Sequence, residues 1–271
     1  IPFEVYGFTT RRANTVEFTE KLKAASSNLT RFEYDELQLN QLFSNKMSKS
    51  DFNLGMRTFY DQMYKLRYLP SLEDFGSTPL NAALLATQYL IQDFMKSNPV
   101  HKLNLVTLTD GESDRVFLRS GVDNSFASRD YVMNINGKKV DLHMGWGDSR
   151  KNTAKILNAV TGPNVTTANF FICDRRDFKN ELYTILPYKH SAQQVARKEM
   201  TKNGVWVVEK ESGYDRRFIM VDKSSSMSGE TDDFEIEATA TPAQIARAFK
   251  KHSGSKKGNR VVTKKFAELV A

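Results

Sequence analysis

A hydroxyl and a carboxylate in two separate turns are the side chains best suited to chemistry in this sequence. Thr78 stands in the turn at residues 76–79, ahead of a helical pattern, and Asp110 follows an apolar run. Mg²⁺ binds a few oxygen ligands and keeps several waters, so a hydroxyl together with carboxylates suits it. The same residues have an ordinary structural interpretation, in which Ser77 or Thr78 caps the helix, Pro79 takes its first position, and Asp110 makes a turn.

A second set of oxygen ligands follows the apolar residues 218–221. Asp222, Ser224 and Ser226 form the pattern Asp-x-Ser-x-Ser. In a circularly permuted domain, the strand before Asp222 would lie beside the strand at residues 103–108 and complete a metal site. The alternative is a solvated Ser/Gly-rich hairpin loop, and both interpretations stay open at this point.

No set of residues for independent catalysis is apparent. No pair of histidines has the spacing of metal ligands, and no HExxH motif, Ser-His-Asp set or Gly-Lys-Ser/Thr phosphate loop occurs. The single cysteine, Cys173, lies in an apolar run that predicts a buried strand. We therefore expect no catalytic activity from this chain alone. The histidines are His101, His143, His190 and His252.

The elements that must position Thr78 and Asp110 form an alternating pattern of helices and strands. Residues 80–94 have helical apolar periodicity, and residues 103–108 predict a buried parallel strand that ends at Asp110. Residues 166–173 repeat this pattern and meet Asp174. A helix followed by such a strand is half of a βαβ unit, which favours a parallel sheet with helices on both faces. Ligands collect at the carboxyl edge of such sheets.

Two hairpins and several further elements complete the pattern. Residues 131–142 predict two strands around Asn136-Gly137, and residues 205–221 predict two strands across Ser212-Gly213. We expect a further strand at residues 3–8, and helices at residues 17–25, 51–66, 149–160, 191–202, 243–252 and 260–271.

The motifs around Thr78 and Asp110 resemble those of a von Willebrand factor A domain. These are Gly-Ser-Thr-Pro-Leu-Asn-Ala-Ala-Leu at residues 76–84 and Thr-Asp-Gly-Glu at residues 109–112. In that family, this threonine and this aspartate belong to the metal-ion-dependent adhesion site. The opening Phe-Glu-Val-Tyr-Gly-Phe-Thr-Thr-Arg at residues 3–11 is similar to the second strand of the cobalt-chelatase large-subunit (CobT-like) A domain. The family's first strand, which carries Asp-x-Ser-x-Ser, is absent here, and we expect it to precede Ile1.

The elements and the resemblance together predict an α/β fold. Its centre would be a three-layer, Rossmann-like, mostly parallel sheet with helices on both faces. We expect the A domain over residues 1–187, truncated at its N-terminus, with a long insertion over 14–74 and a hairpin insertion over 129–146. Residues 190–271 would form a small basic α+β appendage. A chain of 271 residues with 40% hydrophobic and 26% charged residues is long and apolar enough for this architecture.

The resemblance implies a metal-dependent protein-binding module. Mg²⁺ or another divalent cation would accept a carboxylate from a protein client, and the partner would be a MoxR/CobS-type AAA+ ATPase that hydrolyses ATP on its own chain. Phage genomes carry such ATPase and A-domain pairs, so a phage origin fits. The alternative function is a cobalt-chelatase-like subunit in metal insertion into a tetrapyrrole. The metal candidates are Thr78 and Asp110, followed by Ser77, Asp222, Ser224 and Ser226.

Basic residues outnumber acidic ones, 39 to 32, and many of the excess lie near the C-terminus. This gives a second alternative, nucleic-acid binding, although such a run is more often a solvated helical face. No stretch approaches the roughly 18–20 apolar residues of a membrane span, and a lone cysteine suits a reducing compartment. We expect a cytoplasmic protein, in the host cytoplasm if it is viral. The nucleic-acid candidates are Arg247, Lys250, Lys251, Lys257 and Lys264.

Overall fold

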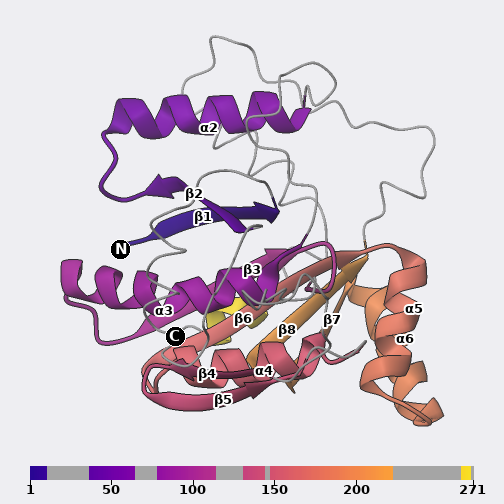
Figure 1. Cartoon of the computed structure of the whole chain (residues 1–271). Helices are drawn as coiled ribbons and strands as arrows, with labels where there is room; N and C mark the ends of the chain where they lie inside the picture. The colour runs from indigo at the N-terminus through magenta and orange to yellow at the C-terminus, as the bar shows by residue number, and fades with distance from the viewer. Residues whose placement is uncertain (11–36, 65–77, 114–130, 144–146, 222–263, 270–271) are drawn as a thin grey trace. The chain divides into compact units, whose positions relative to one another are not determined.

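The computed structural model describes residues 1–10, 37–64, 78–113, 131–143, 147–221 and 264–269 (Figure 1). The chain forms two compact units, the first made of Ile1–His101 with Glu112–Gly162 and the second of Lys102–Gly111 with Pro163–Ala271. This division differs from the predicted boundary near residue 190. Among the helices in the described ranges, none has both the length and the apolar character needed to cross a membrane.

The second unit is built on a four-stranded sheet with the strand order β3-β6-β8-β7. In this sheet β3, β6 and β8 run parallel, whereas β7 is antiparallel to β8. The strands are β3 (Leu103–Thr109), β6 (Val165–Cys173), β7 (Val205–Glu211) and β8 (Tyr214–Val221). The prediction of an α/β chain with a mostly parallel central sheet is confirmed at this level.

β7 and β8 form the hairpin that the sequence predicts. Ser212 and Gly213 have φ angles of 53° and 84°, as a two-residue type I′ turn requires. The other edge of β8 pairs with β6, in a register that aligns Cys173 with Val221. Residues on both sides of position 190 therefore belong to one sheet, and the predicted C-terminal appendage supplies two of its four strands.

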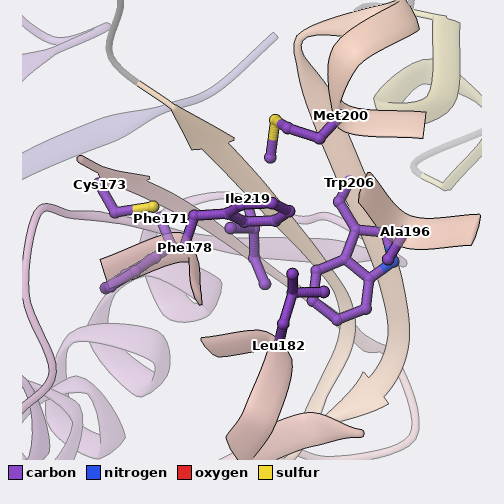
Figure 2. Close-up of a cluster of buried hydrophobic side chains, with 8 residues drawn as sticks. All are labelled: Phe171, Cys173, Phe178, Leu182, Ala196, Met200, Trp206 and Ile219. Carbon is purple, nitrogen blue, oxygen red and sulfur yellow. The ribbon is translucent and has the colours of Figure 1, made fainter. Parts of the chain in front are cut away.

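Two helices cover one face of this sheet, α5 (Arg175–Ile185) and α6 (His190–Asn203). Their buried side chains pack against alternate residues of β6, β7 and β8 (Figure 2). Full burial of a large apolar side chain contributes about 1.5–3 kcal/mol, so this cluster is a major source of stability for the second unit. Its members are Phe171, Cys173, Phe178, Leu182, Ala196, Met200, Trp206 and Ile219.

The opposite face of the sheet has its own aromatic cluster. Phe170 of β6 stacks on Phe218 of β8, with ring centroids 4.7 Å apart and planes 9° apart. Phe266, in the helix at residues 264–269, meets these two rings at centroid distances of 5.5 and 6.4 Å. The sheet thus has helices on both faces, and the end of the chain packs against it.

β3 differs from the prediction of a fully buried strand. Thr107 and Thr109 are buried, whereas Val106 and Leu108 are 44% and 62% exposed. In the part of the chain that the structure describes, β3 pairs only with β6 and is an edge strand. The hydroxyl groups of Thr107 and Thr109 are buried because they form hydrogen bonds with side chains of β6 and β8.

The first unit contains a two-stranded antiparallel sheet beside a long helix. Phe43 of β2 meets Phe52 and Phe59 of α2 at centroid distances of 5.5 and 6.0 Å. β1 and α2 match predicted elements, whereas β2 lies inside the predicted insertion over 14–74 and was not expected. The elements are β1 (Glu4–Thr10), β2 (Leu37–Ser44) and α2 (Lys49–Tyr64). The helix predicted at residues 17–25 lies outside the described residues.

A hairpin and two helices are the other described elements of the first unit. β4 and β5 pair antiparallel across Asn136-Gly137, which confirms the predicted hairpin, and the φ angles of 49° and 78° at these two residues are those of a type I′ turn. The elements are β4 (Tyr131–Ile135), β5 (Lys138–Leu142), α3 (Leu80–Ser97) and α4 (Ser149–Val160).

Candidate functional site

Acidic residues follow the carboxyl ends of the three parallel strands in the second unit. Asp110 comes directly after β3, Asp174 directly after β6, and Asp222 is the next residue in the sequence after β8. Because the carboxyl ends of parallel strands meet at one edge of a sheet, this edge is the natural candidate for a ligand site. The two strands that precede the sequence motifs, β3 before Asp110 and β8 before Asp222, both end at this edge.

The two described carboxylates at this edge differ in what they do. Asp110 is exposed. Asp174 is the N-cap of α5, where its Oδ1 accepts a hydrogen bond of 2.7 Å from the Asp177 backbone N–H. The cap satisfies one of the four backbone N–H groups that a helix N-terminus leaves without intrahelical partners. Asp110 is therefore the better candidate for binding a cation or a partner.

Replacing Asp174 with alanine is expected to lower the free energy of unfolding by about 1 kcal/mol, because the Asp177 N–H then loses its acceptor. Asparagine is a comparable N-cap residue, so Asp174→Asn is the matched control and should cost much less. Urea denaturation followed by circular dichroism measures both changes. Equal losses for the two variants would contradict a capping role.

Thr78 lies in the first unit, immediately before α3, and is half-buried. The structure assigns the N-cap position to Pro79, one residue after Thr78, so Pro79 does not take the first helical position that the sequence predicted. Pro79 makes no side-chain cap hydrogen bond, and the Ala83 N–H donates to the Pro79 carbonyl. Ser77 lies outside the described residues.

Ser113, far from α3 in the sequence, accepts a hydrogen bond from a backbone N–H in the first turn of α3. Its Oγ accepts a hydrogen bond of 2.8 Å from the Asn81 backbone N–H. The buried Asn81 side chain then donates to the Ser149 carbonyl at 3.1 Å and accepts from Thr153 Oγ1 at 2.7 Å. These bonds tie the start of α3 to α4 and to the residues after the Asp110 turn, all within the first unit.

The predicted metal ligands are divided between the two units and the residues outside the described ranges, so the metal site stays a prediction. Thr78 belongs to the first unit and Asp110 to the second, and Ser77, Asp222, Ser224 and Ser226 lie outside the described residues. The idea that the Asp222 strand lies beside β3 is wrong, because β6 lies between β3 and β8. Over the described ranges, no group of three or more His, Cys, Asp or Glu side chains is placed to hold a metal ion.

A buried polar network, which the sequence did not reveal, crosses the sheet below the Asp110 edge. Thr107, Asn169 and Arg217 occupy one row of β3, β6 and β8. Asn169 Nδ2 donates to Thr107 Oγ1 at 2.9 Å, and Arg217 Nε donates to Asn169 Oδ1 at 3.0 Å. Thr107 Oγ1 donates to Tyr214 Oη at 3.1 Å. The network connects all three parallel strands.

A buried ion pair ends this network. Arg217 Nη1 lies 2.8 Å from Glu181 Oε2 of α5, and the two side chains are only 6% and 4% exposed. Arg217 also lies over the Phe171 ring, with Cζ 4.8 Å from the centroid. The charge is thus compensated by a carboxylate, an amide and an aromatic face. The network fixes β3, the strand that leads into the exposed Asp110, to β6 and β8.

Three ionisable groups of this sheet have shifted pKa values. Burial raises the pKa of the Cys173 thiol to about 12, so the thiol stays protonated at neutral pH and is a poor nucleophile. Burial also raises the pKa of Tyr214 to about 12. Burial alone would raise the pKa of Asp215, but hydrogen bonds from Lys210 and Thr167 outweigh it and hold this pKa below its usual value. Of the three, Cys173 ends β6 at the Asp110 edge, whereas Tyr214 and Asp215 begin β8 at the opposite edge of the sheet.

The predicted nucleic-acid residues are mostly beyond the described ranges. Lys264 is exposed at the start of the helix at residues 264–269. The other four candidates, Arg247, Lys250, Lys251 and Lys257, lie outside the described residues. That alternative therefore stays a prediction.

Comparison of the chain with models of protein families, with curated proteins and with solved structures found no match.

Proposed function

We propose that the chain is a protein-binding module that makes its contact at the carboxyl edge of β3, β6 and β8 through a divalent cation. The observation that carries this proposal is the position of Asp110. It is exposed, and it follows a strand that pairs in parallel with β6, whose own neighbour β8 leads directly into Asp222. An exposed carboxylate on a rigid sheet edge is well suited to binding.

The number and type of oxygen ligands at this edge indicate which cation the site would bind. Asp110 is the one carboxylate at this edge that is both described and free of a capping role, so the described residues supply only part of a cation site. Mg²⁺ keeps several of its waters and needs few protein ligands, which makes it the best fit. The proposed further ligands are Thr78 and the Asp222, Ser224 and Ser226 segment, on the sequence motifs alone.

The partner in this proposal is a MoxR/CobS-type AAA+ ATPase, with the chain as an adaptor that presents a client. This part rests on the resemblance to von Willebrand factor A domains at residues 76–84 and 109–112. A cation with an open coordination position would accept a carboxylate from the client. The buried thiol and the capped Asp174 agree with a binding role, since neither is available for catalysis.

Replacing Asp110 with alanine is expected to weaken Mg²⁺ or Mn²⁺ binding about tenfold or more, because the site loses a charged ligand. Isothermal titration of the full chain with each metal measures this directly. Pull-down with the MoxR/CobS-type ATPase of the same genome, with and without EDTA, measures partner binding. Asp141, an exposed aspartate of β5, provides the matched control, and Asp141→Asn should leave both measurements unchanged. Partner binding that ignores both EDTA and Asp110→Ala would contradict the proposal.

A further inference from the structure

The connection between α5 and α6 displays a tyrosine in a conformation that tyrosine rarely adopts. Tyr188 is 94% exposed and has a φ angle of 58°. The Lys189 N–H donates to the Leu186 carbonyl at 3.3 Å, which closes a four-residue turn with Pro187 at its second position. A proline followed by a residue of positive φ is the arrangement of a type II turn, whose third position favours glycine.

The turn is held in place by the protein around it. Buried Gln193 donates from Nε2 to the Leu186 carbonyl at 2.7 Å, and its backbone N–H donates to the Lys189 carbonyl at 2.9 Å. Positive φ is sterically unfavourable for a bulky residue, and a ring that is 94% exposed gains almost nothing from packing. A tyrosine at this position therefore adds little to the stability of the fold. Its exposed ring is available to bind a partner.

The α5–α6 pair is basic along its length and carries further exposed apolar groups close to Tyr188 in the sequence. Tyr183, in the last turn of α5, is 48% exposed, and Val195 of α6 is 63% exposed. Over residues 175–203, acidic residues are few: Asp177, Glu199, and Glu181, which is buried against Arg217. Among the contacts of the described residues, none of the cations of this helical pair takes part in an ion pair. These exposed cations are Arg175, Arg176, Lys179, Lys189, Arg197, Lys198 and Lys202.

We propose that the α5–α6 pair binds single-stranded nucleic acid, with Tyr188 stacking on a base and the exposed cations of the two helices neutralising phosphates. Exposed aromatic rings beside lysine and arginine are the combination by which proteins bind single strands with little sequence preference. Bases of a duplex are stacked on one another, so a protruding ring has access only to unpaired bases. Lysine is depleted at protein interfaces, which makes an acidic protein the weaker candidate. Tyr188 follows the C-terminal end of α5, whereas Asp174 and the Asp110 edge are at the N-terminal end of this helix, and none of the cations listed here belongs to the predicted basic residues after position 240.

The test is fluorescence anisotropy of the full chain with a fluorescein-labelled oligothymidylate of about 12 nucleotides, within the site sizes of single-strand binders. Tyr188→Gly is expected to bind about tenfold more weakly or worse, because it loses the stacking ring. Glycine suits the positive φ, so the melting temperature of this variant should stay the same or rise. Tyr188→Phe keeps the ring and should bind like the original chain.

Charge variants separate phosphate contacts from a general effect of net charge. Lys189→Gln should weaken binding and reduce the slope of log affinity against log salt by about 1, the value for one lost phosphate contact. Lys139→Gln changes the net charge equally on exposed β5 and should leave the affinity unchanged. Affinity that Tyr188→Gly does not lower would overturn the proposal. So would binding of polyglutamate to this surface without binding of oligothymidylate, which would identify an acidic protein as the partner. Neither result bears on the Mg²⁺ titration of Asp110→Ala.

Discussion

Replacing Glu181 with leucine is expected to lower the free energy of unfolding by about 3–5 kcal/mol, because it leaves the Arg217 guanidinium buried without its counter-charge. The pair is 2.8 Å apart, and the two side chains are 6% and 4% exposed. Water cannot reach the cation to replace the lost carboxylate. Urea denaturation followed by circular dichroism measures the change.

A double variant distinguishes the destabilisation caused by an unpaired buried charge from the contribution of the ion pair to the free energy of unfolding. Glu181→Leu combined with Arg217→Met replaces both charges with apolar groups of similar size, and such replacements are often neutral or stabilising. We expect the double variant to recover most of the loss. Glu209→Leu is the surface control. It removes a carboxylate that is 68% exposed and lies 2.9 Å from Arg216, so it should cost only about 0–1 kcal/mol. A Glu181→Leu loss no larger than that of Glu209→Leu would contradict the burial of the pair.

Replacing Phe218 with alanine is expected to cost about 3–5 kcal/mol, because the deleted ring leaves a cavity in the centre of the sheet. Phe218 is fully buried on β8, stacks on Phe170 and meets Phe266 edge-on. The same denaturation experiment measures the loss. Val132→Ala, at a residue that is 55% exposed on β4, should change stability by no more than about 0.5 kcal/mol. A small loss for Phe218→Ala would show that this face of the sheet is not packed as described.

The elements that could be predicted from the sequence are those fixed by local chemistry. Asn136-Gly137 and Ser212-Gly213 each specify a type I′ turn, and each forms a hairpin at the expected place. The helical periodicity of α3 and the apolar run of β3 gave both elements nearly correctly. In these cases a few neighbouring residues are sufficient to predict the element, because turn type and side-chain periodicity depend on residues that are close in the sequence.

The features that could not be predicted depend on residues far apart in the chain. The β2 segment was missed because its alternation is interrupted by polar residues. The parallel pairing of β6 with β8 joins residues 48 positions apart, and the Arg217–Glu181 pair joins residues 36 apart. Arginine and threonine in a strand ordinarily predict a solvent-facing side. The inward orientation of Arg217 and Thr107 makes sense only with Asn169 and Glu181 beside them.

For the candidate site, the sequence correctly placed Asp110 directly after a strand of a parallel sheet. It did not place the other ligands, because their arrangement depends on strand order. The permuted arrangement required the Asp222 strand next to β3, and β6 occupies that position instead. The use of Asp174 as a helix cap could be recognised only once the helix boundary was known.

The separation of β3 from its partner has a consequence for the protein as it emerges from the ribosome. Thr107 of β3 and Asn169 of β6 lie 62 residues apart, and β8 follows later still. At translation rates of about 5–20 residues per second, β3 waits about 3–12 s before β6 is synthesised. During that interval the Leu-Val-Thr-Leu segment has no strand to pair with among those described, and unpaired apolar strands are prone to aggregate. Among the described strands of this sheet, β3 therefore waits longest for a partner during translation.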